Sequence, residues 1–226
     1  MEINLPSGTK AELIHPSTGE SKRGLVVIPD VMGLRPLFVD LAAELAEKNQ
    51  WSVCVFDLYP GQENLEVGER LATAGLLNDN DVLGDAIAAA EATTCDPVGI
   101  LGFCMGGMYT LKAVSTQRFD RHCSFYGMIQ VPDQWQGQGQ AEPLELLKTG
   151  DPKSVLAIIG NLDSWTPPHH VELLTETGAK VVCYEEADHG FVHDASRPAH
   201  RPVEAADAWL QATKWFNLES KSPVSV

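Results

Sequence analysis

The sequence predicts an α/β fold, in which a mostly parallel central sheet carries helices on both faces. Three observations lead to this prediction. Short apolar runs typical of buried strands alternate with segments of helical periodicity along the 226 residues. The rhythm of strand, helix, strand, helix favours parallel strands joined by crossover helices. One apolar run, at 98–103, ends in a glycine-rich turn that leads directly into a helical segment.

The elements follow in chain order. A weak alternation over 2–16 predicts one or two edge strands, and apolar runs predict strands at 25–29, 51–56, 98–103, 122–126, 154–159 and 180–184. Helical spacing predicts helices at 36–50, 65–77, 79–93, 105–115, 167–178 and 199–216. Thr166 is a candidate N-cap and Gly178 a candidate stop for the fifth helix. The predicted inward faces are Leu83, Ile87 and Ala90 in the third helix, and Val203, Ala206, Leu210 and Thr213 in the last.

Neither an internal repeat nor a linker divides the chain, so we expect a single domain over 1–226. The segment 129–153 has few apolar residues and includes a Gln-Gly repeat at 136–140. It is interpreted either as a partial lid near the carboxyl ends of the strands or as a plain surface insertion. The polar tail at 219–226 is expected to fray.

The composition excludes several classes of partner. Sixteen basic and 31 acidic residues give a net charge of −15, which argues against nucleic acid and anionic membranes. No apolar run is long enough to span a bilayer, and the N-terminal residues do not resemble a secretory signal. The five cysteines form no CxxC pair, and three lie in strand-like runs. We therefore expect buried free thiols and a cytoplasmic location, whereas the oligomeric state stays unknown.

The motif Gly102-x-Cys104-x-Gly106 joins the apolar run 98–103 to the helix predicted at 105–115. Small residues two positions before and after the cysteine let the backbone turn sharply without Cβ clashes. The helix N-terminus then stabilises a thiolate. This pattern is typical of the nucleophile elbow of α/β-hydrolases, with cysteine in place of the usual serine. The alternative is a buried cysteine in a glycine-rich turn.

An acid and a histidine follow in the order that α/β-hydrolases use. Asp163 comes just after the strand predicted at 154–159, and His189 comes just after the one at 180–184. The carboxyl ends of parallel strands share one edge of a sheet, so both side chains are expected near Cys104. The oxyanion hole is expected from the backbone N–H groups of Met105 and Val31.

Other interpretations of these residues remain open. Asp163 could be an ordinary turn residue, and Asp188 is a rival acid, although adjacent residues rarely orient one another. His189 and His193 are four apart, which invites a zinc site, but no third ligand or HExxH-like helix accompanies them. We therefore expect neither a metal nor a cofactor.

The elbow, together with the stretches 160–163, 188–191, 57–59 and 29–33, resembles the dienelactone hydrolase (carboxymethylenebutenolidase) family of α/β-hydrolases. The resemblance covers about 24–216. It implies a triad of Cys104, Asp163 and His189, and an oxyanion hole at Val31 and Met105.

The resemblance also implies an acidic residue that modulates the thiol. Asp30 occupies its place, where the family's best-known members carry glutamate. Those members hold a substrate carboxylate with arginines, one of them at the position of His193, and an imidazole is a weaker carboxylate anchor than a guanidinium. The candidate substrate-binding residues are Arg35, Arg70, Tyr126, Trp165, Phe191 and His193, with Arg197 as a further arginine that could take the anchoring role.

The chain is thus predicted to be a cysteine-nucleophile hydrolase that cleaves small esters or lactones through a covalent acyl-enzyme. Thiolates are good leaving groups, which favours enol lactones, activated esters and thioesters over amides. Two alternatives stay open. One is a ligand-binding or sensing protein on the same scaffold with little turnover. The other is a redox-sensing thiol at Cys104, which would want a resolving cysteine nearby.

Overall fold

The computed structural model describes residues 1–62 and 65–218. Its strands are β1 (Glu2–Asn4), β2 (Lys10–Ile14), β3 (Arg23–Ile28), β4 (Trp51–Phe56), β5 (Val98–Phe103), β6 (Arg121–Phe125), β7 (Val155–Gly160) and β8 (Lys180–Tyr184). They form one sheet in the order β1-β2-β4-β3-β5-β6-β7-β8. The pairs β1–β2 and β2–β4 are antiparallel, and the strands from β4 to β8 run parallel. The predicted α/β-hydrolase fold is confirmed.

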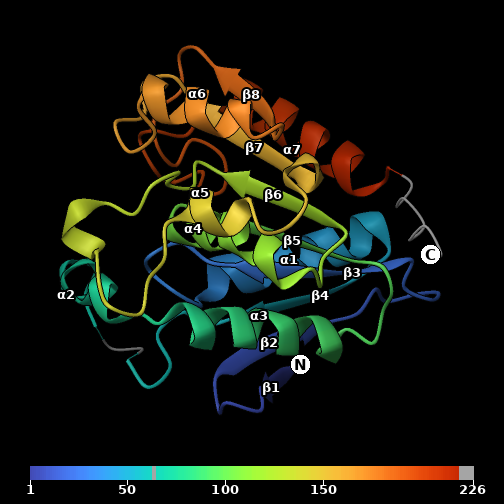
Figure 1. Ribbon diagram of the computed structural model, residues 1–226. Coiled ribbons are helices and arrows are strands. Elements are labelled where there is room, and N and C mark those ends of the chain that lie inside the picture. Colours follow the sequence, from blue (N-terminus) through green and yellow to red (C-terminus); the bar gives the residue numbers. More distant parts are fainter. Residues whose placement is uncertain (63–64, 219–226) are drawn as a thin grey trace, which may run out of the picture.

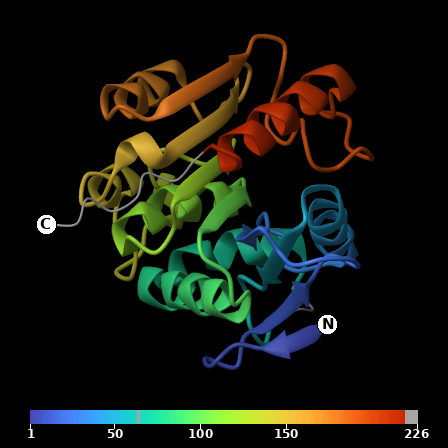
Figure 2. The ribbon, with the colours of Figure 1, turned by 90° about the vertical axis from the view of Figure 1, so that its right-hand side faces the viewer.

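Helices cover both faces of this sheet (Figures 1 and 2). They are α1 (Pro36–Asn49), α2 (Val67–Thr73), α3 (Asp79–Ala92), α4 (Met105–Lys112), α5 (Pro143–Leu147), α6 (Pro168–Glu176) and α7 (Pro202–Phe216). Helices α1 and α7 pack on one face, whereas α3, α4, α5 and α6 pack on the other. The strands β3, β4, β5 and β7 are buried along their whole length, because side chains of both orientations enter a core.

The predicted face of α7 is wrong in register, and the predicted face of α3 is wrong at Ile87, although Ala90 is buried and Leu83 packs against the core. In α7, Val203 is 80% exposed and Leu210 is 49% exposed, whereas the residues that face the sheet are mostly alanines. These are Ala205, Ala208 and Ala212, followed by Trp215 and Phe216. In α3, Ile87 faces outward and the buried residues include Val82, Ala86 and Ala89. Small alanines let a helix approach the sheet closely, so packing favoured them over the larger residues of the predicted stripe.

Smaller differences concern helix ends and thiols. The N-cap of α6 is Pro167, not Thr166, and the final helix begins at Pro202. Cys54 and Cys123 are buried as expected, but Cys183 is exposed because it lies on the edge strand β8. The predicted fraying of 219–226 concerns residues outside the described part of the chain.

The segment 129–153 is tied to the helices beneath it. It carries α5 and a short 3-10 turn, Asp133–Trp135. The buried Lys112 Nζ donates to Asp79 Oδ1 at 2.7 Å, and Asp79 Oδ2 accepts from the Ala141 N–H at 2.8 Å. Trp135 is buried and stacks on Trp165, with ring centroids 5.3 Å apart. The segment therefore borders the edge of the sheet where β7 ends, and whether it moves as a lid stays a prediction.

Candidate active site

Cys104 lies in the turn between β5 and α4, with φ +56° and ψ −118°. Non-glycine residues rarely adopt a positive φ, so this backbone is strained. Packing leaves it little freedom. A Cβ at Gly102 would lie 2.2 Å from the Gly106 carbonyl oxygen, and one at Gly106 would lie 2.3 Å from the oxygen of Ile28. The half-buried thiol is therefore held at the N-terminus of α4, where the helix favours negative charge.

His189 and Asp163 meet beside this turn. His189 Nδ1 lies 2.8 Å from Asp163 Oδ2, and the Asp163 carboxylate is buried. Asp163 Oδ1 also accepts from the Trp165 N–H at 2.8 Å, which fixes the carboxylate. Asp188, the rival acid, accepts a bond from the backbone N–H of His189 and lies at the surface. The imidazole is thus oriented by Asp163.

The protonation of His189 reflects its two neighbours. Burial alone would lower the pKa of His189, but Asp163 and the Cys104 side chain together raise it to about 10. His189 Nε2 is buried and has no acceptor in hydrogen-bond geometry within the described part of the chain. The Cys104 sulfur is nevertheless close enough to raise the pKa of His189. This arrangement favours an imidazolium at His189 at neutral pH.

The expected oxyanion donors lie where two loops approach the elbow. Met105 is the first residue of α4, and Val31 is in the half-buried loop after β3. Among the described residues, neither backbone N–H donates a hydrogen bond to the protein. Both groups are therefore available to a ligand oxygen.

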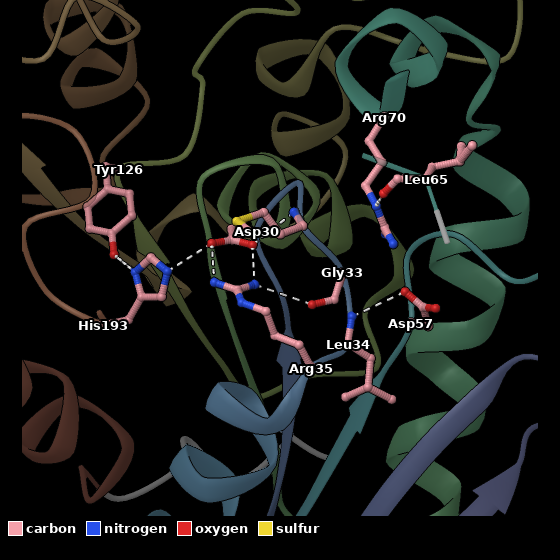
Figure 3. A network of polar contacts seen from close by, with 10 residues as sticks. Asp30, Gly33, Leu34, Arg35, Asp57, Leu65, Arg70, Tyr126 and His193 are labelled. Atoms are coloured by element: carbon pink, nitrogen blue, oxygen red, sulfur yellow. Dashed lines mark hydrogen bonds and ion pairs between the residues drawn. The ribbon is translucent and has the colours of Figure 1, made fainter. Parts of the chain in front are cut away.

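Asp30 lies inside a chain of polar contacts (Figure 3). Arg35 donates from Nη1 to Asp30 Oδ1 at 2.6 Å and from Nη2 to Oδ2 at 3.0 Å. His193 Nε2 lies 2.9 Å from Asp30 Oδ2, and His193 Nδ1 is hydrogen-bonded to the Tyr126 hydroxyl. Burial alone would raise the pKa of Asp30, but His193 and Arg35 hold it well below its usual range. The carboxylate expected to modulate the Cys104 thiol is thus bound to these two partners.

The other expected substrate-binding residues differ in their exposure. Tyr126 and Phe191 are fully buried, and His193 is 9% exposed. Arg70 is also buried, donates from Nε to the Leu65 oxygen at 2.9 Å and lies over the Tyr59 ring. Trp165 is half-buried, and its ring centroid lies 6.4 Å from that of His189. Of these residues, only Trp165 is not buried, and it lies near His189.

Two residues gain importance from the structure. Tyr59, buried in the loop after β4, donates its hydroxyl to Met105 Sδ at 3.2 Å and so supports the head of α4. Arg197 is exposed and lines an open cleft of about 560 Å³ with His189, His200 and Arg201. Arg201 is paired with Glu204, whereas the Arg197 guanidinium makes no hydrogen bond or ion pair with any described residue. Tyr59 lies in the stretch 57–59 that contributed to the family resemblance but was given no role there, and no sharp motif surrounds Arg197.

Within the described residues, no group of three or more His, Cys, Asp or Glu side chains is arranged to hold a metal ion. His193 points its Nε2 at Asp30, so the spacing of four from His189 reflects two different roles. The described helices include none with the length and apolarity needed to cross a bilayer.

Comparisons with known proteins identify the family and agree with the fold. A model of the dienelactone hydrolase family matches residues 10–220. A probable 2-oxo-3-(5-oxofuran-2-ylidene)propanoate lactonase from a Bradyrhizobium species is 28% identical over 201 residues, covering 82% of this chain and 79% of the relative. A carboxymethylenebutenolidase from Rhodococcus opacus is 25% identical, with 85% of this chain and 79% of the relative covered. The crystal structure of a putative dienelactone hydrolase from Klebsiella pneumoniae shares the fold, with a TM-score of 0.83 at 21% identity over 97% of this chain and 98% of that one.

Proposed function

Because the chain belongs to the dienelactone hydrolase family, we propose that it hydrolyses small esters or lactones through an acyl-enzyme on Cys104. One observation carries the proposal. Cys104, with its strained backbone, is the N-cap of α4 and lies beside the His189 imidazole, whose Nδ1 is 2.8 Å from Asp163 Oδ2. A nucleophile, a base and an orienting acid in this relation are what covalent acyl transfer requires.

Acylation begins with attack of the Cys104 thiolate on the substrate carbonyl carbon. The carbonyl oxygen becomes an oxyanion, which the N–H groups of Val31 and Met105 stabilise. The tetrahedral intermediate collapses by breaking the bond to the ester oxygen. The His189 imidazolium donates the Nε2 proton to that oxygen, so a lactone leaves as a ring-opened hydroxyl or enol still attached to the acyl group.

Deacylation returns the enzyme to its starting state. Neutral His189 removes a proton from a water molecule, which attacks the thioester carbonyl. The second tetrahedral intermediate expels the Cys104 thiolate and releases a carboxylic acid. Asp163 keeps the proton on Nδ1 throughout, so Nε2 always faces the reacting atoms.

The cleft beside His189 supports a proposal for the substrate class. The Bradyrhizobium relative is named for a lactone that bears a propanoate group. In this chain, Arg197 is the exposed guanidinium in the cleft that contains His189, and it has no protein partner there among the described residues. We propose that Arg197 receives a carboxylate of the substrate and that Trp165 borders the acyl group. The other candidate residues then support the site without contacting the substrate. These are Arg35, Arg70, Tyr126, Phe191 and His193.

A cytoplasmic setting forms part of the proposal. It is supported by the free cysteines, two of them buried, and by the absence of disulfides among the described residues. The acidic balance of −15 supports a small-molecule partner rather than nucleic acid.

A hydrolysis panel tests the proposal. Purified protein is assayed with dienelactones, short p-nitrophenyl esters and thioesters, alongside Cys104→Ala. The proposal expects turnover by the natural chain and a loss of at least about a thousandfold in kcat for the variant. Wild-type rates in Cys104→Ala would rule out this nucleophile, and a single burst without turnover would favour a ligand-binding or sensing protein.

A further inference from the structure

We propose that His193 is a positioning residue for hydrolysis. In its neutral form it holds the oxyanion loop, defined as residues 29–33, against the histidine loop, defined as residues 187–193. The inference rests on the proposed function, because it concerns the same reaction. It assigns a role to the residue that the sequence left as a candidate for substrate binding.

The two ring nitrogens of His193 bond to two different elements. Nε2 lies 2.9 Å from Asp30 Oδ2 in the oxyanion loop, and Nδ1 is hydrogen-bonded to the Tyr126 hydroxyl after β6. Figure 3 shows the imidazole between Tyr126 on one side and Asp30 on the other, with the Arg35 guanidinium bonded to both oxygens of the carboxylate. His193 is therefore a bridge that starts four residues after His189.

These partners fix the tautomer. Asp30 is ionised and can only accept, so His193 Nε2 must carry the proton. Neutral Nδ1 then accepts from the Tyr126 O–H. A doubly protonated imidazole would place an N–H against that hydroxyl and force the hydroxyl hydrogen elsewhere.

The surroundings favour the neutral form. The side chain of His193 is 1% exposed, and its faces contact Phe38 and Phe103, with ring centroids at 5.5 and 4.7 Å. The charged groups that act on His193 are Asp30 in the oxyanion loop, Arg35 just before α1, and Asp194 and Arg197 in the segment after the histidine loop. Burial lowers the pKa of His193, and the two arginines act in the same direction against Asp30.

Asp30 transmits this anchoring to the oxyanion donor. Its Oδ1 accepts from the Met32 N–H, and its carbonyl oxygen accepts from the Gly33 N–H, both at 2.9 Å. These bonds close a tight turn around Val31, whose N–H donates to no acceptor among the described residues. Because Oδ2 is held by His193 and Arg35, the turn has a fixed position relative to His189. Displacing an oxyanion donor by about 1 Å can cost about a hundredfold in rate.

Three variants test the inference. His193→Leu places an apolar side chain among the surrounding aromatic rings and removes both hydrogen bonds of the imidazole. His193→Gln offers one amide donor and one carbonyl acceptor without charge. Tyr126→Phe removes a single oxygen atom. Phe216→Leu is the matched control, because Phe216 is equally buried but packs against Trp51 at the opposite end of the sheet.

Each variant is assayed for kcat and KM on one p-nitrophenyl ester and for its melting temperature. We expect kcat to fall about 10- to 100-fold in His193→Leu and about 3- to 10-fold in Tyr126→Phe, with KM changed less than about threefold. His193→Gln should recover kcat to within about fivefold of the natural chain. Phe216→Leu should lower the melting temperature and leave kcat near its natural value.

The inference is overturned if His193→Leu keeps natural kcat, or if Gln is no better than Leu. It is also overturned if kcat follows the melting temperature across all four variants. Where His193→Leu does not fold, Tyr126→Phe decides alone, since natural kcat in that variant contradicts the bridge. Cys104→Ala is assayed in parallel: full activity there removes the proposed function itself, whereas an inactive Cys104→Ala with an active His193→Leu removes only the bridge.

Discussion

At the scale of single residues, the proposed chemistry depends on how Cys104 and His189 are placed relative to each other. The positive φ of Cys104 presents the sulfur at the start of α4, and Asp163 holds His189 toward it. Asp30 carries another negative charge near the site, but Arg35 pairs with both of its oxygens. Neutralising that carboxylate limits its repulsion of a thiolate at Cys104.

The raised pKa of His189 predicts a pH-dependent contribution to stability. His189 titrates near 10 in the folded chain against an ordinary value of 6.5, so the folded state binds its proton more tightly. The contribution is fully present below the ordinary value and is lost as the pH rises toward about 10. The free energies of unfolding in urea of the natural chain and of His189→Gln should therefore converge as the pH rises through this window. A constant difference, or one that grows with pH, would contradict the assignment; the exposed His169→Gln serves as control.

Arg197 predicts selectivity for carboxylated substrates. A charge-assisted hydrogen bond contributes about 1.5–3 kcal/mol, so Arg197→Gln should raise KM for a carboxylated lactone about 10- to 100-fold. A neutral p-nitrophenyl ester should be unaffected. Arg201→Gln is the control, because Arg201 lines the same cleft but is paired with Glu204. Equal losses on both substrates, or in both variants, would show that Arg197 is not the anchor.

At the scale of elements, the elbow depends on how closely α4 approaches β3. A Cβ on Gly106 would meet the carbonyl oxygens of Ile28 and Pro29 at 2.3 Å, and backbone atoms cannot yield cheaply. Gly106→Ala should cost about 3 kcal/mol or more in the free energy of unfolding and reduce kcat, since the turn carries Cys104. Gly84→Ala in α3 meets nothing within 4 Å and should stabilise the protein by about 0.5–1 kcal/mol. Chemical denaturation measures both, and similar effects of the two changes would contradict this packing.

The elements also show what sequence reasoning can reach. The motif around Cys104, and the positions of Asp163 and His189 after their strands, were readable because strand ends collect at one edge of a parallel sheet. The register of α7 and the outward position of Ile87 in α3 were not, because alanine carries a weak hydrophobic signal but allows the closest packing. The bridge from Tyr126 through His193 to Asp30 includes a contact between residues 163 positions apart, His193 and Asp30, and no local pattern encodes such a contact.

At the scale of the whole molecule, one sheet edge gathers every part of the site. Loops after β3, β4, β5, β6, β7 and β8 bring the oxyanion loop, Tyr59, Cys104, Tyr126, Asp163 and His189 together. Helices pack on both faces of the sheet whose strands carry these loops (Figure 1). In the cleft beside His189, Arg197 and Arg201 face two acidic residues, Glu186 and Asp188, and the Arg197 guanidinium has no ion pair with any described residue. The fold therefore supplies the positioning, and a few side chains supply the chemistry.

The central claim is that Cys104 carries the acyl group during turnover. Mass spectrometry of protein quenched during hydrolysis of p-nitrophenyl acetate tests it most directly, with His189→Asn used to slow deacylation. The account predicts one acetyl group per chain on the peptide that contains Cys104, accumulating in His189→Asn and absent in Cys104→Ala. An acetyl group on another residue that persists in Cys104→Ala, together with undiminished turnover, would contradict it.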